Sequence, residues 1–292
     1  MLYWLCLCSI DNSKRSTISS NTVVELCSFI DIRNELSGGV MFCSTSVDIV
    51  VKSSVFQNCH GSYAGVMYFQ ARKAIIMECL LSECSSTGHI GGIYCCLSDT
   101  SNISCVSLYK CSSAYRLIWW ECNVENSVNY LNHSQSYTPC NEITTGSGSS
   151  PMNYHYILMD SCSNPSCGGI LYFMSGRISL EYLTVINCIF GTGEGLILLA
   201  GGSQTIARYA FVKNCTSSYY IKYYTGGGTI TFYNSIIYEN QYLTVSKYNI
   251  LTVGTPYFEM KCGSKIDFHS PSNIARFPRL IMYFITFITS NL

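Results

Sequence analysis

The sequence predicts an all-β fold, a parallel β-helix solenoid with about 25–27 residues and three short strands in each coil. A unit that opens on Gly and an apolar run and closes on Cys recurs along the chain. The closing residues are Cys59, Cys84, Cys111, Cys162, Cys188 and Cys215, and their separations are 25, 27, 51, 26 and 27 residues. The separation of 51 is about two periods. Sustained self-similarity at such a period is typical of a repeat architecture.

The composition of each unit favours strands over helices. Each unit holds three short runs rich in Val, Ile, Tyr and Phe, separated by Gly, Ser, Asn, Thr and Asp, which is the composition of strands and turns. No window shows the i, i+3, i+4, i+7 apolar spacing of an amphipathic helix. Stacked coils bury a continuous core, with neighbouring strands roughly 4.8 Å apart. A β-propeller is the alternative fold, but its blades need roughly 40 to 45 residues.

The repeats divide the chain into a cap, a stack of coils and a tail. Residues 1–20 are weakly patterned, and we expect them to cap the helix or to be the start of a fragment. Residues 21–245 carry the β-helix repeats. Within them, residues 123–153 contain few apolar residues and the run TTGSGSSP, which indicates either a degenerate coil or a protruding loop. The repeat then fades, and residues 246–292 are expected to form a C-terminal cap or tail.

The charge balance argues against one class of partner. Lys plus Arg number 17 and Asp plus Glu number 17, so the formal net charge is zero. Nucleic-acid binding needs a basic stripe, so we expect no nucleic-acid partner. The chain has no Cys-x-x-Cys pair and no His-Glu-x-x-His motif. The sequence therefore predicts no metal site and no cofactor.

The 18 cysteines leave two arrangements open. Strand spacing falls within the Cα distance that disulfides tolerate, and a disulfide framework would fit secretion. The other arrangement, which we favour, is an internal ladder of reduced thiols that pack as small hydrophobic groups. Three Asn-x-Ser/Thr sequons, at Asn102, Asn132 and Asn214, are candidate glycosylation sites. On these grounds we expect an extracellular or cell-surface location.

Neither end of the sequence carries a full targeting or membrane signal. Residues 1–10 form an apolar run with no basic residue before it, unlike a signal peptide. The apolar run at 280–288 has nine residues, too few to span a bilayer. We expect any membrane association to come from missing or truncated ends of the chain.

Two short motifs resemble those of known surface proteins. Gly followed by apolar residues resembles the GGA-aliphatic motif of polymorphic outer-membrane proteins, with Val or Ile in place of the usual Ala; it occurs at 38–41, 64–67, 91–94 and 168–171. The Asn-Cys closings resemble those of β-helix surface proteins of trichomonad parasites; they lie at 58–59, 187–188 and 214–215. The resemblance covers roughly residues 20–240. It implies a right-handed, pectin-lyase-like helix exposed at a cell surface.

The resemblance also implies an enzymatic alternative, because pectin-lyase-like folds often carry polysaccharide lyases or glycosidases. Such enzymes need paired carboxylates, or a basic residue beside acidic ones. No carboxylate lies on either face of the Gly-led strands, so no catalytic residue is predicted. For this alternative, the first residues to inspect are Asp160, Glu181 and Arg177.

A candidate binding surface comes from the apolar residues of the Gly-led strands. Alternation along these strands places one residue of each strand in a common strip, to which we add two tryptophans: Met41, Met67, Tyr94, Leu171, Ile197, Trp119 and Trp120. An extended apolar strip is a binding site if it is exposed. Two other arrangements stay open, in which the chain covers the strip or the strip points inward.

These observations favour a non-catalytic surface or secreted protein that mediates adhesion to a cell or glycan. The expected partner is a host-cell protein or a glycan. A carbohydrate-active enzyme and a structural segment of a longer surface protein are the alternatives.

Overall fold

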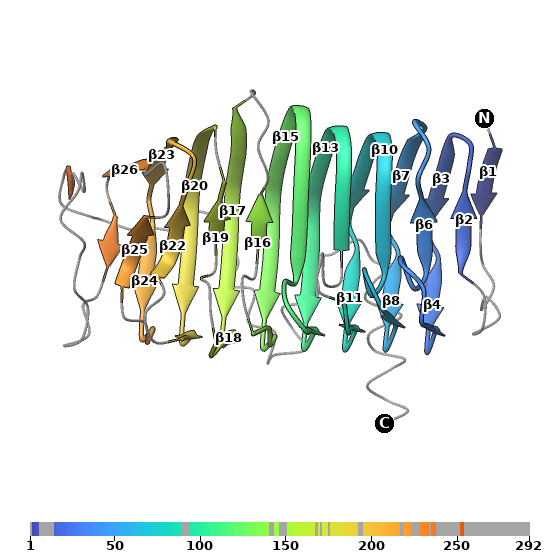
Figure 1. Cartoon of the computed structure of the whole chain (residues 1–292), viewed down its shortest axis with the longest axis horizontal. Coiled ribbons are helices and arrows are strands. Elements are labelled where there is room, and N and C mark those ends of the chain that lie inside the picture. The colour runs from blue at the N-terminus through green and yellow to red at the C-terminus, as the bar shows by residue number, and fades with distance from the viewer. Residues whose placement is uncertain are drawn as a thin grey trace. The chain divides into compact units, whose positions relative to one another are not determined.

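A computed structural model describes the greater part of the repeat region. The described residues are 2–5, 15–88, 94–139, 143–145, 151–166, 169, 171–174, 176–191, 195–216, 219–223, 228–233, 235–237 and 252–253. The chain divides into two units, Met1–Pro256 and Tyr257–Leu292, and all described residues belong to the first. All the secondary-structure elements among these residues are strands, and they stack as a parallel β-solenoid of about 7 turns (Figure 1). The predicted fold class is confirmed.

Successive coils stack strand over strand, so that each strand pairs in parallel with the strand one coil away. Four ladders result. Ladder 1 contains β2 (Ser16–Ile18), β6 (Met41–Cys43), β16 (Ile143–Thr145), β19 (Leu171–Phe173), β22 (Gly195–Leu199), β25 (Tyr219–Tyr223) and the first parts of β10 (Met67–Met77), β13 (Tyr94–Tyr109) and β15 (Ile118–Ser134).

Ladder 2 follows ladder 1 in each coil. It contains β1 (Leu2–Leu5), β3 (Thr22–Glu25), β7 (Asp48–Lys52), β23 (Ser203–Arg208), β26 (Gly228–Tyr233), β28 (Thr252–Val253), the middle parts of β10, β13 and β15, and the first parts of β17 (Met152–Asp160) and β20 (Arg177–Ile186). The long strands β10, β13 and β15 arch over the upper edge in Figure 1 as they pass from ladder 1 to ladder 2.

Ladders 3 and 4 complete each coil. Ladder 3 contains β4 (Ser28–Ile30), β8 (Val55–Gln57), β11 (Leu80–Ser82), β24 (Phe211–Lys213), β27 (Ile236–Ile237) and the last parts of β13, β15, β17 and β20. Ladder 4 contains two-residue strands, β5 (Arg33–Asn34), β9 (His60–Gly61), β12 (Ser85–Ser86), β14 (Ser112–Ser113), β18 (Ser163–Asn164) and β21 (Ile189–Phe190). Ladders 1 to 3 correspond to the three predicted strands, and ladder 4 is an addition.

Along the described coils the chain turns at two corners, and the residue at each corner has a positive φ. The first corner joins ladders 2 and 3, and its residues are Leu26, Ser53, Glu78, Cys105, Tyr130, Tyr156, Tyr182 and Tyr209, with φ between 47 and 58°. The second corner joins ladders 3 and 4, and its residues are Asp31, Asn58, Glu83, Lys110, Gln135, Ser161, Asn187 and Asn214, with φ between 51 and 57°. A single left-handed residue turns the chain sharply, so these positions bend each coil around its core.

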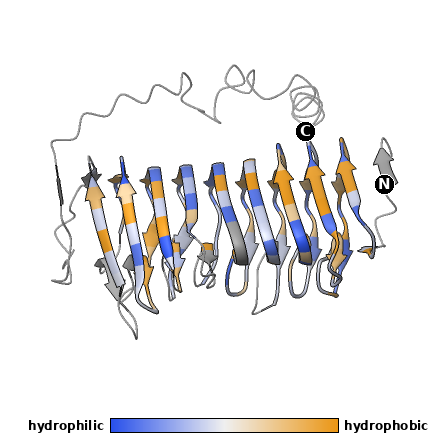
Figure 2. Ribbon diagram, turned by 90° about the horizontal axis from the view of Figure 1, so that it is seen from above, coloured by the Kyte–Doolittle hydropathy of each residue, from blue (hydrophilic) through white to orange (hydrophobic). Residues whose placement is uncertain are grey.

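The core consists of columns of apolar side chains, one residue from each coil. The inward column of ladder 2 is Val24, Val51, Ile76, Ile103, Val128, Tyr154, Leu180, Ala207 and Phe232, all buried. Hydrophobic and hydrophilic residues alternate along the strands in Figure 2. This alternation gives each coil an apolar inner face, and stacking removes that face from water.

The glycine that opens the repeat has a steric cause. A Cβ atom on Gly39 would lie 2.4 Å from the carbonyl oxygens of both His60 and Gly65. The preceding Gly38 has a φ of +62°, a conformation that glycine adopts without strain. The Gly-Gly pair therefore marks the point where ladder 4 turns tightly into ladder 1.

The predicted apolar strip is part of the core. Met41, Met67, Leu171 and Ile197 are at most 1% exposed, so the expectation of an exposed binding strip is wrong for these residues, and they point inward. Val40, directly before Met41, is equally buried. Alternation between faces holds along a straight strand, whereas Val40 lies in the bend before β6, where Val40 and Met41 both donate to the carbonyl of Val66.

For residues 123–153, the sequence predicts either a degenerate coil or a protruding loop. The described part is a coil, because β15 continues to Ser134 and pairs with both β13 and β17. Tyr137 then bridges Ser112 and Ser163 in ladder 4. Residues 140–142 and 146–150 lie outside the described residues. Polar composition did not disrupt the stack because the inward positions Val128 and Leu131 are apolar and buried.

Candidate functional site

A stack of four tyrosines runs along the first corner over four successive coils. The stack, called the tyrosine ladder below, is Tyr130, Tyr156, Tyr182 and Tyr209. Consecutive ring centroids lie 4.6, 4.6 and 4.9 Å apart, with interplanar angles of 1, 2 and 11°. Tyr130 is 46% exposed, and the other three are half-buried. The ladder is therefore a surface feature and not part of the core.

The ring spacing follows from the fold. Residues in register on neighbouring parallel strands lie about 4.8 Å apart, which matches the separation of stacked aromatic rings. Within the ladder each inner ring has another ring on both faces, so a ligand meets ring edges and hydroxyl groups. Tyrosine provides such contacts at low cost in conformational entropy, which is why it is favoured in binding surfaces.

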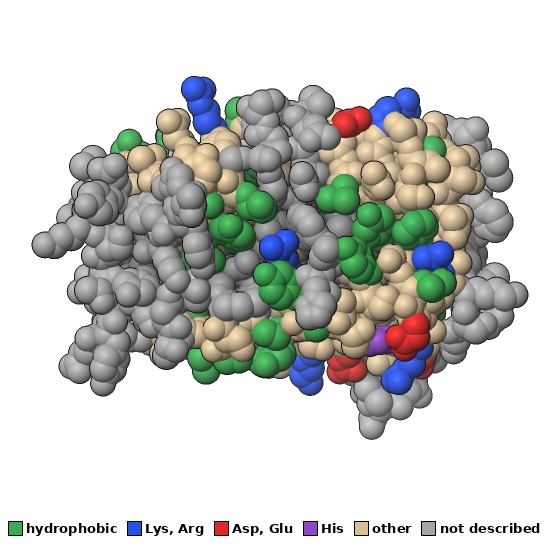
Figure 3. Space-filling view, in the orientation of Figure 1, with side chains coloured by type: hydrophobic (Ala, Val, Ile, Leu, Met, Phe, Trp, Pro, Cys, Tyr) green, Lys and Arg blue, Asp and Glu red, His purple; other side chains and the backbone are tan. Residues whose placement is uncertain are grey.

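A row of three titratable side chains, His155, Glu181 and Arg208, lies beside the tyrosine ladder, each one residue before a tyrosine. The Glu181 carboxylate lies 3.3 Å from Nδ1 of His155 and 3.8 Å from Nη1 of Arg208. The Arg208 guanidinium in turn lies 5.5 Å from the ring centroid of Tyr233, a cation–π arrangement. These charges balance one another. On the face drawn in Figure 3, Lys and Arg side chains are scattered and do not form one basic patch.

Amide and carboxylate groups lie on the other side, at the second corner and the end of ladder 3. Asn214 Nδ2 donates to Asn187 Oδ1 at 3.2 Å, and Asn187 Nδ2 donates to Asp160 Oδ1 at 3.2 Å. The hydroxyl of Ser161 donates to the same Asp160 oxygen at 2.8 Å. Asn adopts positive φ more readily than most residues, so the sequence places it where the corner needs it and the side chain then links adjacent coils.

Inside the second corner, the closing cysteines hydrogen-bond the backbone. Each thiol donates to the carbonyl two residues earlier and to a carbonyl of the preceding coil, at 3.2–3.8 Å; they are Cys59, Cys84, Cys111, Cys162, Cys188 and Cys215. Ser136 takes this position in the coil without a closing Cys and donates to the Ser134 carbonyl at 3.1 Å. The position therefore selects a small side chain that can donate a hydrogen bond.

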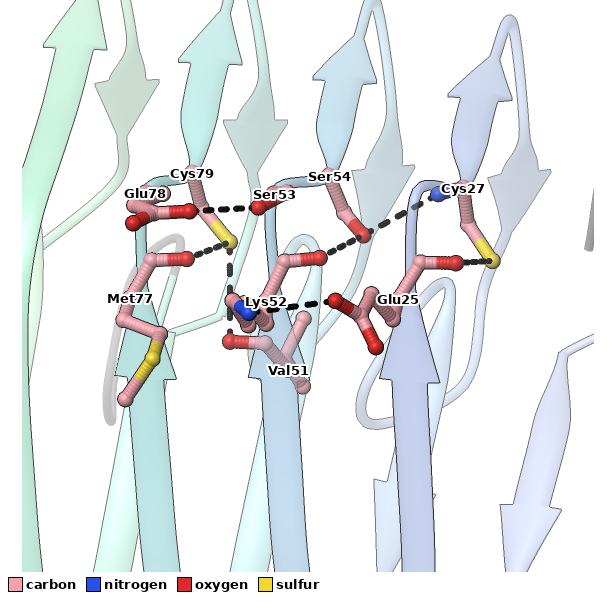
Figure 4. Close-up of polar contacts among 9 residues, drawn as sticks. All are labelled: Glu25, Cys27, Val51, Lys52, Ser53, Ser54, Met77, Glu78 and Cys79. Atoms are coloured by element: carbon pink, nitrogen blue, oxygen red, sulfur yellow. Dashed lines mark hydrogen bonds and ion pairs between the residues drawn. The ribbon is translucent and has the colours of Figure 1, made fainter. Parts of the chain in front are cut away.

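The same arrangement recurs inside the first corner, as Figure 4 shows. Cys79 donates to the carbonyl of Met77 at 3.2 Å. Ser54 donates to the carbonyl of Lys52 at 2.8 Å and accepts from the backbone amide of Cys27 at 3.2 Å. At both corners, buried thiols or hydroxyls thus add a second hydrogen bond to carbonyls that also accept from a backbone amide of the adjacent coil, as the carbonyls of Lys52 and Met77 do.

Among the cysteines whose side chains the structure describes, ten are free thiols, and nine of these are buried. Burial raises the pKa of Cys79 to about 12 and that of Cys84 well above its usual range. For Cys188 and Cys215, a hydrogen bond with a neighbouring thiol raises the pKa, and burial adds to the effect. Protonated, buried thiols are poor nucleophiles, so these cysteines are structural.

The other predicted site residues are only partly described. The backbone of Tyr94 in β13 is in register with Met67 and Ile118, and Trp119 and Trp120 lie in β15. The side chains of these three residues lie outside the described part of the structure.

The three sequons have different surroundings. Asn132 is only 7% exposed, so a glycan has no access to it in the folded chain, and the prediction for this residue is wrong. Asn102 is half-buried in the middle of β13, between Ile75 and Ser127. Asn214 is exposed at the second corner, and glycosylation there stays a prediction.

The residues named for the enzymatic alternative do not form one site. Glu181 pairs with His155 and Arg208 before the first corner, whereas Asp160 lies at the end of ladder 3 with Ser161 and Asn187. The tyrosine ladder separates the two carboxylates along the coil. Arg177 is exposed at the start of β20. Each acidic group is thus committed to partners of its own.

Two further searches were confined to the described part of the chain. Within it, no cluster of three or more His, Cys, Asp or Glu side chains is placed to hold a metal ion. Nor do these residues form a helix of the length and apolarity that crossing a membrane requires.

The sequence contained a signal for the tyrosine ladder that the repeat analysis missed. Each of its tyrosines lies six residues before a closing position, which is Ser136, Cys162, Cys188 or Cys215. The coil that ends at Ser136 closes on Ser instead of Cys, so the recurrence of Cys alone does not reveal it as a regular repeat. Adding that coil brings the four tyrosines into one column.

The chain was compared with family models, with curated proteins and with solved structures, and none of them matches it.

Proposed function

We propose that this protein is a non-catalytic binding protein, displayed at a cell surface or secreted, that adheres to a cell-surface protein or glycan of a host. The observation that carries the proposal is the tyrosine ladder, a partly exposed aromatic row held rigid by the stacked coils. Aromatic side chains are enriched among residues that dominate binding energy. Its flanking charges are already paired, so we propose that contact is made mainly by ring edges, hydroxyls and amides.

The resemblance to trichomonad surface proteins and to pectin-lyase-like β-helices extends this proposal. Those families display their helices outside the cell, and the same location is proposed for this chain. Asn214, the exposed sequon, is where glycosylation would mark passage through a secretory route. The carbohydrate-active enzyme is not favoured, because the carboxylates first named for it lie apart and have other partners.

The test is a cell-adhesion assay with the purified full chain. The variant Tyr156→Asn/Tyr182→Asn removes two rings and keeps a residue type that tolerates positive φ. Since a binding hot spot costs about 2 kcal/mol or more when truncated, we expect adhesion to fall at least tenfold. Tyr156→Phe/Tyr182→Phe keeps the stack and reports on the hydroxyls alone.

The matched control is Tyr137→Asn, which makes the same change at a 48% exposed tyrosine of ladder 4. It should adhere as the unmodified chain does. Circular dichroism of each variant checks that the solenoid is intact. Normal adhesion by the folded Tyr156→Asn/Tyr182→Asn variant would show that the ladder is not the contact surface. Absence of this chain from the labelled fraction after biotinylation of intact source cells would rule out display at the surface.

A further inference from the structure

A polar groove lies where ladder 1 turns into ladder 2, whereas the tyrosine ladder lies at the other end of ladder 2 and in later coils. Its volume is about 360 Å³, within the range of small-molecule sites. Three successive coils line it: Ser44 and Ser46 between β6 and β7, Gln70 and Ala71 in β10, and Leu97, Ser98 and Asp99 in β13.

The lining combines a small apolar floor with groups that bind hydroxyls. Ala71 is buried and Leu97 half-buried, so both lie at the base. Ser44, Ser46 and Gln70 are exposed and present hydroxyl and amide groups that both donate and accept hydrogen bonds. Asp99, also exposed, adds a carboxylate, which accepts hydrogen bonds more strongly than a neutral group.

A strand irregularity lies beside that carboxylate. The register between β13 and β15 shifts between Ser98 and Thr100, where two steps along β13 face three steps along β15, from Cys122 to Glu125. The extra residue is therefore in β15, and Asp99 is the β13 residue opposite it. Bulges are over-represented beside binding and active sites.

The charges around the groove select the class of ligand. The nearby Arg72 is held by Asp48, with Nε 2.8 Å from Oδ1, and this contact lowers the pKa of Asp48. The one charged residue in the lining is Asp99. A lining without a basic side chain offers an anion no counter-charge, which disfavours phosphates, sulfates and uronates. Hydroxyl-rich neutral molecules satisfy both the polar rim and the apolar floor.

We infer that this groove binds a neutral saccharide, with Asp99 and Gln70 hydrogen-bonding sugar hydroxyls over the floor formed by Ala71 and Leu97. The inference deepens the proposed adhesive function by naming a ligand class, at a site separate from the tyrosine ladder. The groove is open and shallow, so a dissociation constant on the order of 1 mM is expected for a disaccharide.

The experiment is saturation-transfer NMR on the full chain with maltose, lactose, cellobiose and chitobiose as probes, and glucuronate as the anionic comparison. At least one neutral probe should receive saturation, and glucuronate should receive much less. Asp99→Asn and Gln70→Leu should each weaken binding up to roughly tenfold, the loss expected when one hydrogen bond to the ligand is removed. Circular dichroism confirms that both variants are folded.

The outcomes separate this inference from the proposed function. Tyr156→Asn/Tyr182→Asn should bind saccharide normally while losing adhesion. Adhesion of the unmodified chain without saturation of any neutral probe would overturn the saccharide site and leave the adhesive function standing. Unchanged affinity in folded Gln70→Leu and Asp99→Asn would place the saccharide elsewhere. Stronger binding of glucuronate than of the neutral probes would overturn the ligand class.

Discussion

Single residues with positive φ decide the shape of every coil. An L-residue in this conformation costs roughly 1–2 kcal/mol, and sixteen non-glycine residues in the described part of the chain adopt it. Two sets of hydrogen bonds offset this cost locally. At the second corner, side chains of corner residues in adjacent coils hydrogen-bond to one another. The buried side chain of the residue after the corner donates to backbone carbonyls. For example, Nδ2 of Asn58 donates a hydrogen bond to Oδ1 of Asp31 in the preceding coil at 2.5 Å. The Asn-Cys pair at the end of a repeat combines both functions in two residues.

Asn187 tests this account of the corner. Asn187→Ala should destabilise the fold by about 1–2 kcal/mol, because alanine tolerates positive φ poorly and loses the bonds to Asp160 and Asn214. Asn187→Gly loses the same bonds but adopts the conformation freely, so it should be more stable than the alanine variant. Urea unfolding measures both. Equal stability of the two variants would contradict a role for backbone strain.

Ionisation of Cys79 makes the free energy of unfolding decrease at alkaline pH. Its pKa is raised by burial from 9.0 to about 12, so the unfolded chain loses this proton first. The stabilisation is complete below pH 9 and is lost as the pH rises towards 12, at about 1.4 kcal/mol per pH unit. Cys79→Ser keeps a donor, as Ser54 does one coil earlier, and should show a smaller loss between pH 9 and 10.5 in urea unfolding. The same loss in both proteins would exclude Cys79 as the cause.

At the scale of elements, we expect the turn from ladder 4 to ladder 1 to be the part of the coil that tolerates substitution least. Gly39→Ala should prevent folding or destabilise it by several kcal/mol, since the new Cβ would overlap two carbonyl oxygens of the backbone. Ser37→Ala, two residues earlier, removes a hydroxyl in the same turn and serves as the control, with little expected effect. Thermal unfolding monitored by circular dichroism compares them. A Gly39→Ala variant as stable as the control would mean that the turn relaxes.

The strands of ladders 1 to 3 were predictable because their apolar residues recur once per coil. Ladder 4 was not, since its strands are two residues long and built from residues such as His60, Ser85 and Ser112. Nor was the direction of Met41, because alternation fails at the bend before β6. The tyrosine ladder required the Ser136 coil to be aligned with its neighbours, and the polar groove depends on how the turns between ladders 1 and 2 of three coils lie together, which no periodicity reveals.

At the scale of the whole solenoid, the coil is the unit of stability. Repeat proteins hold together through contacts between neighbouring units, so removing one complete coil should leave a folded stack. Deletion of residues 59–83 joins Asn58 to Cys84 and preserves both corners. We expect a β-rich spectrum and a cooperative transition at a moderately lower temperature.

The comparison for this deletion is removal of residues 59–71, about half a coil. That deletion joins Asn58 at the second corner directly to the middle of β10, so the ladders after the junction lose their register with those before it. The protein should therefore be unfolded or aggregated. Size-exclusion chromatography and circular dichroism distinguish the two. If both deletions behave alike, register between coils does not determine stability.

The pairing of each strand with a strand 20–28 residues before it also bears on how the chain is made. During translation, the partner of every new coil has already left the ribosome, and no strand of the described stack waits for a distant one. Contacts between segments close in sequence form early, and ribosomes add only about 5–20 residues per second. The solenoid can therefore lengthen at the pace of synthesis, with one unfinished edge exposed at a time.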